Sequence, residues 1–166
     1  TVSASTFVPK PFTAFQWCGQ NDIKTIIEKQ NYLKSHLTNK AVKFNWHEPE
    51  ISVLEAIIAK GDRRVCKAIY EAWKLGAKFD SWREFFNYDT WMKAFENRGI
   101  DYKYYSERQM SIDENLPWNH LDILVSKEFL KREYKNAMNE KVTPNCRKAC
   151  SGCGAASAGC GVCFEK

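Results

Sequence analysis

The sequence predicts a fold of the α/β to mainly α class, in which a strand–helix–strand segment comes first, a run of helices follows and a cysteine-rich tail ends the chain. Small and β-branched residues at 1–7 are typical of a buried strand, and residues 42–46 alternate between apolar and polar side chains, as a half-buried strand does. Elsewhere the apolar residues recur at helical spacing. A chain of 166 residues is long enough to bury a core without disulfides.

The first 46 residues are predicted to form a strand, a helix and a second strand. The prolines that follow the first strand force the chain to leave it in an extended conformation. The helix begins near Asn21, with Asn21 or Asp22 as its N-cap, because apolar residues then recur at helical spacing. The second strand, at 42–46, ends before Pro49.

The sequence after residue 50 predicts mainly helices. Serine, aspartate and glycine mark their ends, because the first two cap helix N-termini and glycine follows helix C-termini. We expect helices at 51–60, at 62–76, from Ser81 on, at 89–99 and at 126–139. Between the last two, a polar connector leads to "NHLDILV", a candidate short strand. In a strand His120 and Asp122 would share one face and could form an acid–base pair, or His120 could be purely structural.

The charge of the chain gives little support for a nucleic-acid partner. The net charge of +5 comes from 25 basic and 20 acidic residues spread along the sequence. A local excess that could face RNA or a ribosome, or form a solvated helix face, comprises Lys127, Lys131, Arg132, Lys135, Lys141, Arg147 and Lys148. No apolar run approaches the roughly 18 residues that span a bilayer, and no secretory signal begins the sequence, so we expect a cytoplasmic protein with no membrane partner.

The tail holds five of the seven cysteines and predicts a metal or iron–sulfur site. They are Cys146, Cys150, Cys153, Cys160 and Cys163. Two Cys-x2-Cys pairs bring sulfurs together across tight turns, and the glycines between them let backbone N–H groups approach the sulfurs. The six-residue gap between the pairs is shorter than the roughly 15 to 20 residues of paired-knuckle zinc sites. An iron–sulfur cluster therefore fits better than zinc, and an unliganded tail or partial disulfides are the alternative.

Four stretches resemble, in this order, the C-terminal part of a family of radical SAM proteins that has an N-terminal cobalamin-binding-type domain. They are "STFVPKPFTAFQW", "HEPEISVLEAIIAKGDRR", "AWKLGAKFDSW" and "LPWNHLDILVSKEFLKREYKNA", the last followed by cysteines. The resemblance implies that residues 1–50 end a (β/α) barrel, that 51–140 form a family-specific helical extension and that 141–166 form the metal-binding tail. The sequence starts with Thr1 inside a predicted strand, so we expect a piece of a longer protein.

The resemblance also implies a chemistry. In such enzymes a reduced [4Fe–4S] cluster cleaves S-adenosylmethionine to a 5′-deoxyadenosyl radical, and cobalamin can be a further cofactor. The loop that binds this cluster is not in the sequence, so the upstream part of the same polypeptide is the implied partner and the chain alone would be inactive. The rival hypothesis is a non-catalytic, zinc-binding module that contacts RNA or another protein.

Two residues near the first strand are candidate cofactor ligands in the barrel hypothesis. Lys10 and Gln16 belong to the loop after that strand, and barrel active sites lie at the carboxyl ends of the strands. Both are expected to contact S-adenosylmethionine or the substrate. The alternative is that the prolines only turn the chain and that the aromatic residues of the loop anchor it.

Overall fold

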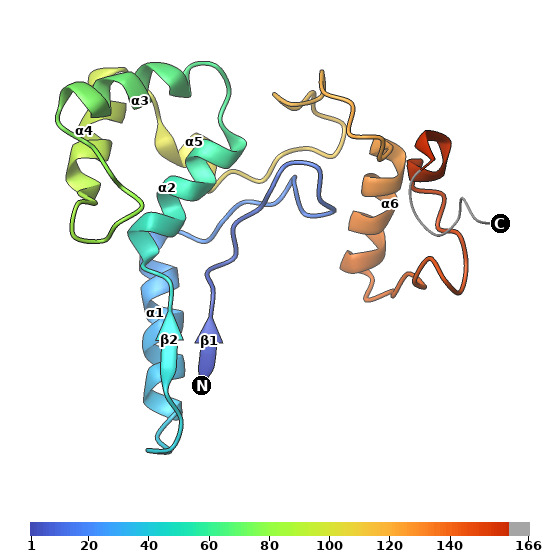
Figure 1. Ribbon diagram of the computed structural model, residues 1–166, viewed down its shortest axis with the longest axis horizontal. Coiled ribbons are helices and arrows are strands. Elements are labelled where there is room, and N and C mark those ends of the chain that lie inside the picture. Colours follow the sequence, from blue (N-terminus) through green and yellow to red (C-terminus); the bar gives the residue numbers. More distant parts are fainter. Residues whose placement is uncertain (160–166) are drawn as a thin grey trace. The chain divides into compact units, whose positions relative to one another are not determined.

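The structure, a computed structural model that describes residues 1–159, is mostly helical with a small parallel sheet (Figure 1). Strand β1 (Val2–Ala4) pairs in parallel with β2 (Phe44–Trp46), and Ser3 lies opposite Asn45. Helix α1 (Ile23–His36) connects the two strands, as a parallel pair requires a long crossover. The strand–helix–strand order and the mainly helical class are confirmed, although both strands are shorter than the sequence predicts.

The remaining helices follow α1 in the order that the sequence predicts, except that within residues 1–159 the helix from Ser81 is missing and two short helices, at 102–106 and 155–158, are additional. They are α2 (Pro49–Lys60), α3 (Val65–Lys74), α4 (Tyr88–Asn97), α5 (Tyr102–Ser106) and α6 (Lys127–Met138), followed by a short 3-10 helix, η1 (Ala155–Ala158). Polar caps fix several starts: the carboxylate of Asp22 accepts from the Thr25 amide at 2.7 Å, and the hydroxyl of Ser126 accepts from the Phe129 amide at 3.2 Å. None of the helices within residues 1–159 is both long and apolar enough to cross a membrane.

The helix expected from Ser81 is absent from the described structure. Residues 79–85 form turns instead, in which the Phe85 amide donates to the Trp82 carbonyl at 3.0 Å. Trp82 and Phe85 of this segment are exposed. A segment this short gains too few hydrogen bonds to repay helix nucleation, and Asn87 starts a new helix directly after it.

The segment "NHLDILV" forms turns rather than a strand. The Leu121 amide donates to the Trp118 carbonyl at 3.0 Å, and the carboxylate of Asp122 accepts from the Leu124 amide at 2.8 Å. Leu124 has a φ of 66°, which no strand residue adopts. The turn chemistry of Asp122 therefore overrides the alternating pattern, and the strand geometry in which His120 and Asp122 would share a face is not formed.

The chain packs as two compact units. The first comprises residues 1–9 and 18–109, and the second comprises residues 10–17 and the chain from 110 onward. The core of the first is built mainly from α2, α3 and α4, with Val53, Ile57, Val65, Trp91 and Phe95 among its buried residues. The core of the second consists of Trp17, Met110, Leu116, Trp118 and Leu130. The domain limits that the sequence suggests at residues 50 and 140 stay a prediction.

A buried lysine ties together three segments of the first unit. Lys60 is 0% exposed, and its ammonium donates to the carbonyl of Cys18 at 2.5 Å and to that of Arg108 at 3.2 Å. Between the two segments, a Cβ added at Gly19 would lie 2.0 Å from the Glu107 carbonyl oxygen, so no other residue fits there. The end of α2 therefore fixes the loop after residue 17 against the chain that follows α5.

Candidate metal centre

The tail forms a side-chain turn at Cys150, in which the cysteine sulfur takes the place of a backbone acceptor. The backbone N–H of Gly152 donates to the sulfur of Cys150 at 3.4 Å. Gly152 and Gly154 have φ angles of 66° and 104°, in the left-handed region that glycine adopts at little cost. Backbone N–H groups that approach a cysteine sulfur are typical of metal and cluster sites. The turn from Cys150 to Cys153 thus has the backbone arrangement that a thiolate ligand needs.

This turn is held against the start of α6. The Ser126 amide donates to the Cys153 carbonyl at 2.8 Å, and the guanidinium of Arg132 donates to the Ser151 carbonyl. A Cβ at Gly154 would lie 3.0 Å from the Leu124 carbonyl oxygen, so glycine permits the close approach. The cysteine turn is therefore positioned by residues more than 15 places earlier in the sequence.

The described residues contain only part of the expected ligand set. Cys146 and Cys150 are exposed, Cys153 is half-buried, and all three are free thiols. Across residues 1–159, no three His, Cys, Asp or Glu side chains gather closely enough to hold a metal ion. Cys160 and Cys163 lie outside the described residues. Cys150 and Cys153 are three residues apart in the sequence, and their sulfurs suit a thiophilic metal, because sulfur ligands select zinc or iron–sulfur clusters.

Of the two predicted cofactor ligands, the structure buries Gln16 and leaves Lys10 partly exposed. Gln16 is 3% exposed, and its side-chain oxygen accepts from the indole N–H of Trp118 at 2.7 Å and from the Phe12 amide at 3.0 Å. The side-chain NH2 group makes no hydrogen bond within residues 1–159. The Lys10 carbonyl accepts from the Thr13 hydroxyl at 2.8 Å. The Gln16 oxygen thus attaches the loop to Trp118, and the Gln16 NH2 group can still donate hydrogen bonds to a ligand.

A cavity of about 340 Å³ lies beside Gln16 in the second unit. Its apolar lining includes Trp118 and Leu130, and its polar lining includes Gln16, His120, Asp122 and Lys127; Lys10 does not line it. The Nδ1 of His120 lies 3.0 Å from the Pro117 carbonyl oxygen. Because a carbonyl only accepts, Nδ1 has the proton, and in the neutral ring Nε2 is an acceptor. The cavity can therefore hold a small molecule that has both apolar and hydrogen-bonding groups.

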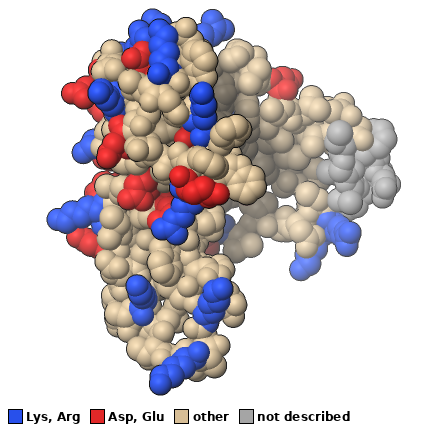
Figure 2. Space-filling view, turned by 60° about the vertical axis from the view of Figure 1, so that its left-hand side comes forward, with Lys and Arg blue, Asp and Glu red and all other residues tan. Residues whose placement is uncertain are grey.

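Several basic residues of α6 are engaged inside the second unit. Lys131 pairs with Asp113 at 2.6 Å, and the hydrogen bond from its ammonium holds the pKa of that carboxyl below its usual range. The ammonium of Lys127 lies 3.4 Å from the Glu114 carbonyl oxygen. Over the face drawn in Figure 2, basic and acidic side chains are interspersed. The basic run of the sequence is thus only partly available to an anionic partner.

No protein-family model, curated protein or solved structure matches this chain. The described part of the second unit offers a cysteine turn held against α6, a buried glutamine–tryptophan pair and a cavity of mixed polarity. Sequence reasoning named Gln16, His120 and the cysteines one by one. Trp118 was missed, because its contact with Gln16 joins residues 102 positions apart and has no local signal.

Proposed function

We propose that this chain is the C-terminal part of a radical SAM enzyme and that its second unit is an auxiliary metal-binding module with cysteine ligands. The observation on which this rests is the turn at Cys150, where a glycine N–H points at the sulfur and α6 holds the turn in place. Backbone N–H groups aimed at a cysteine sulfur are typical of metal and cluster sites, and the thiolate is the species that binds metals.

In this proposal four thiolates surround one centre. Cys150, Cys153, Cys160 and Cys163 are the simplest set, and Cys146 is a fifth thiol that can exchange with one of them. An iron–sulfur cluster is our first choice because of the short gap between the two pairs, and zinc is the second. When bound, a cluster would supply one-electron chemistry, whereas zinc would cross-link the tail.

The assignment to a radical SAM enzyme is supported by the first strands. A parallel pair joined by a helix, as in β1, α1 and β2, is the unit that (β/α) barrels repeat. The loop with Lys10 and Gln16 leaves β1 at its carboxyl end, which is where barrels place their active sites. We propose that the Gln16 NH2 group and the Lys10 ammonium contact S-adenosylmethionine or substrate. The catalytic [4Fe–4S] cluster and any cobalamin would be bound outside this chain.

Metal analysis tests the module. The protein is purified without oxygen, and its iron, zinc and acid-labile sulfide are measured for the wild type, for Cys150→Ser with Cys153→Ser, and for Cys18→Ser with Cys66→Ser as the matched control. We expect the tail variant to lose its metal and the control to keep it. Equal metal content in the wild type and the tail variant would refute the proposal.

A second candidate function is a non-catalytic, zinc-binding module that contacts RNA or protein. Exposed basic residues around the tail favour it, among them Lys135, Lys141, Arg147 and Lys148. Zinc without iron or sulfide in the anaerobic protein would support this candidate over the radical SAM enzyme.

A further inference from the structure

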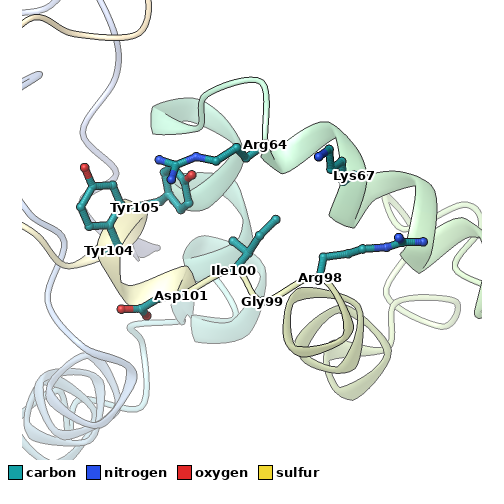
Figure 3. A pocket seen from close by; sticks show the side chains of 8 residues that line it. All are labelled: Arg64, Lys67, Arg98, Gly99, Ile100, Asp101, Tyr104 and Tyr105. Atoms are coloured by element: carbon teal, nitrogen blue, oxygen red, sulfur yellow. The ribbon is translucent and has the colours of Figure 1, made fainter.

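The first unit has a basic and aromatic pocket at the start of α3. It encloses about 330 Å³ and is lined mainly by Arg64, Lys67, Arg98, Ile100, Tyr104 and Tyr105. Figure 3 shows Arg64 and Lys67 on the α3 side, the two tyrosines on the α5 side and Ile100 between them. This pocket is independent of the cysteine tail.

Lys67 is the side chain of this pocket that can attract an anion. The guanidinium of Arg64 pairs with Asp62 at 2.6 Å, and that of Arg98 pairs with Glu71. These hydrogen bonds from the arginines hold the pKa values of both carboxyls below their usual range. The Lys67 ammonium makes no ion pair or hydrogen bond within residues 1–159. Asp62 and Glu71 are thus neutralised by the arginines, and the carboxylate of Asp101, which also lines the pocket, accepts from the Lys103 amide at 3.0 Å. The charge of Lys67 remains available.

An exposed aromatic ring lies beside these cations. Tyr104 is 43% exposed. The guanidinium carbon of Arg64 lies 5.9 Å from the centre of its ring, and that of Arg108 lies 4.3 Å from it. Rings flanked by guanidinium groups are the platforms on which nucleic-acid bases stack.

The exposed face of α3 extends this pattern away from the pocket. Tyr70 and Trp73 are 54% and 56% exposed, and their rings are stacked with centroids 5.7 Å apart. The Lys74 ammonium lies 4.6 Å from the Tyr70 ring centre. Lys67, Tyr70 and Lys74 follow one another at positions i, i+3 and i+7, so they share one side of the helix. The 10 residues of α3 give a surface about 15 Å long, which suits several nucleotides rather than one.

We propose that the α3 surface, formed by Lys67, Tyr70, Trp73, Lys74 and Tyr104, binds single-stranded nucleic acid. Its phosphates contact the two lysines and its bases stack on the three aromatic rings. The aromatic rings alone would suit a protein or a nucleic acid, and the two lysines favour the nucleic acid, because lysine is depleted from protein–protein interfaces. A duplex is disfavoured because exposed rings bind unpaired bases, which a duplex does not offer.

The test measures fluorescence anisotropy of the whole chain with a labelled oligouridylate of about 12 nucleotides. Oligothymidylate and a duplex of the same length are the comparison probes. We expect both single strands to bind more tightly than the duplex, with an affinity that falls between about 50 and about 200 mM salt. Absence of single-strand binding at about 50 mM salt, or tighter binding of the duplex, would overturn the proposal.

Paired variants then locate the surface. Lys67→Ala with Lys74→Ala should reduce the salt slope by about 1.4, since each phosphate contact on a single strand contributes about 0.7. Lys24→Ala with Lys40→Ala makes the same change of charge elsewhere in the first unit and should leave the slope unchanged. An equal reduction in both pairs would mean that only net charge matters, and the site assignment would be wrong.

The aromatic residues are tested in the same way. Trp73→Ala should weaken binding roughly 5- to 150-fold if one base stacks on it, and Trp73→Phe should preserve most of the affinity. Tyr32 on α1 is 63% exposed, and Tyr32→Ala is the matched control that should bind as the wild type does. If Trp73→Ala fails to fold, the affinities of Trp73→Phe and of the lysine pair decide whether the proposal holds. Unchanged binding in Trp73→Ala and in the lysine pair would refute the proposal.

Discussion

Replacing Lys60 by Met should destabilise the first unit, because the carbonyls of Cys18 and Arg108 then lose a buried donor. Methionine keeps an unbranched side chain of similar size and has no hydrogen-bond donor for the two carbonyls. Removing the donor to a buried carbonyl costs about 1 to 3 kcal/mol. Part of this cost is offset because a charged group no longer has to be buried. We expect a net loss of about 2 to 4 kcal/mol in the free energy of unfolding.

The assay is urea unfolding followed by far-UV circular dichroism, together with thermal melting. In a protein of this size each kcal/mol lowers the melting temperature by about 2 to 4 °C, so a decrease of roughly 4 to 16 °C is expected for the first unit. Lys24→Met is the control, because the Lys24 side chain is 86% exposed and its loss should change stability by less than about 0.5 kcal/mol. If Lys60→Met is as stable as this control, the reasoning about the buried lysine is wrong.

Three further predictions concern the second unit. Gln16→Ala should lower the free energy of unfolding by about 1 to 3 kcal/mol, since the buried indole N–H of Trp118 loses its acceptor. If Gln16→Ala lowers the stability of a Trp118→Phe protein by the same amount, this pairing is contradicted. Gly154→Ala should lower the free energy of unfolding by about 1 to 3 kcal/mol, because alanine is strained at the left-handed φ of 104° that Gly154 adopts. Thermal melting measures this loss, and an unchanged melting temperature would show that Gly154 does not adopt this conformation. The pKa of Asp113 is lowered by Lys131, so its stabilising effect is present above the unfolded pKa of about 3.9 and is lost as pH falls through the folded value. The stability advantage of the wild type over Asp113→Asn should therefore shrink below about pH 4, and a pH-independent difference would argue against the ion pair.

Local sequence features predicted local structure well. The helix starts at Asp22 and Ser126 were foreseen because a cap uses a side chain and an amide only three residues apart. The short strand predicted around His120 does not form, because a single Asx turn at Asp122 outweighs an alternating pattern that has no partner strand.

Long-range contacts could not be predicted from the sequence. The lysine at the end of α2 gives no local sign that it will donate to carbonyls 42 and 48 residues away. Nothing around Gln16 indicates that its partner is Trp118. The cysteine spacing predicted a metal site, but the hydrogen bond that attaches the Cys153 carbonyl to the start of α6 is visible only in the folded chain.

X-ray absorption at the iron and zinc K-edges tests the proposed metal centre most directly. Protein prepared without oxygen is compared with the Cys150→Ser, Cys153→Ser variant. The account predicts a metal surrounded by sulfur in the wild type, with metal–sulfur distances of about 2.3 Å if the metal is zinc, and loss of that shell in the variant. A shell of only nitrogen and oxygen, or identical spectra from both proteins, would contradict thiolate ligation by the tail.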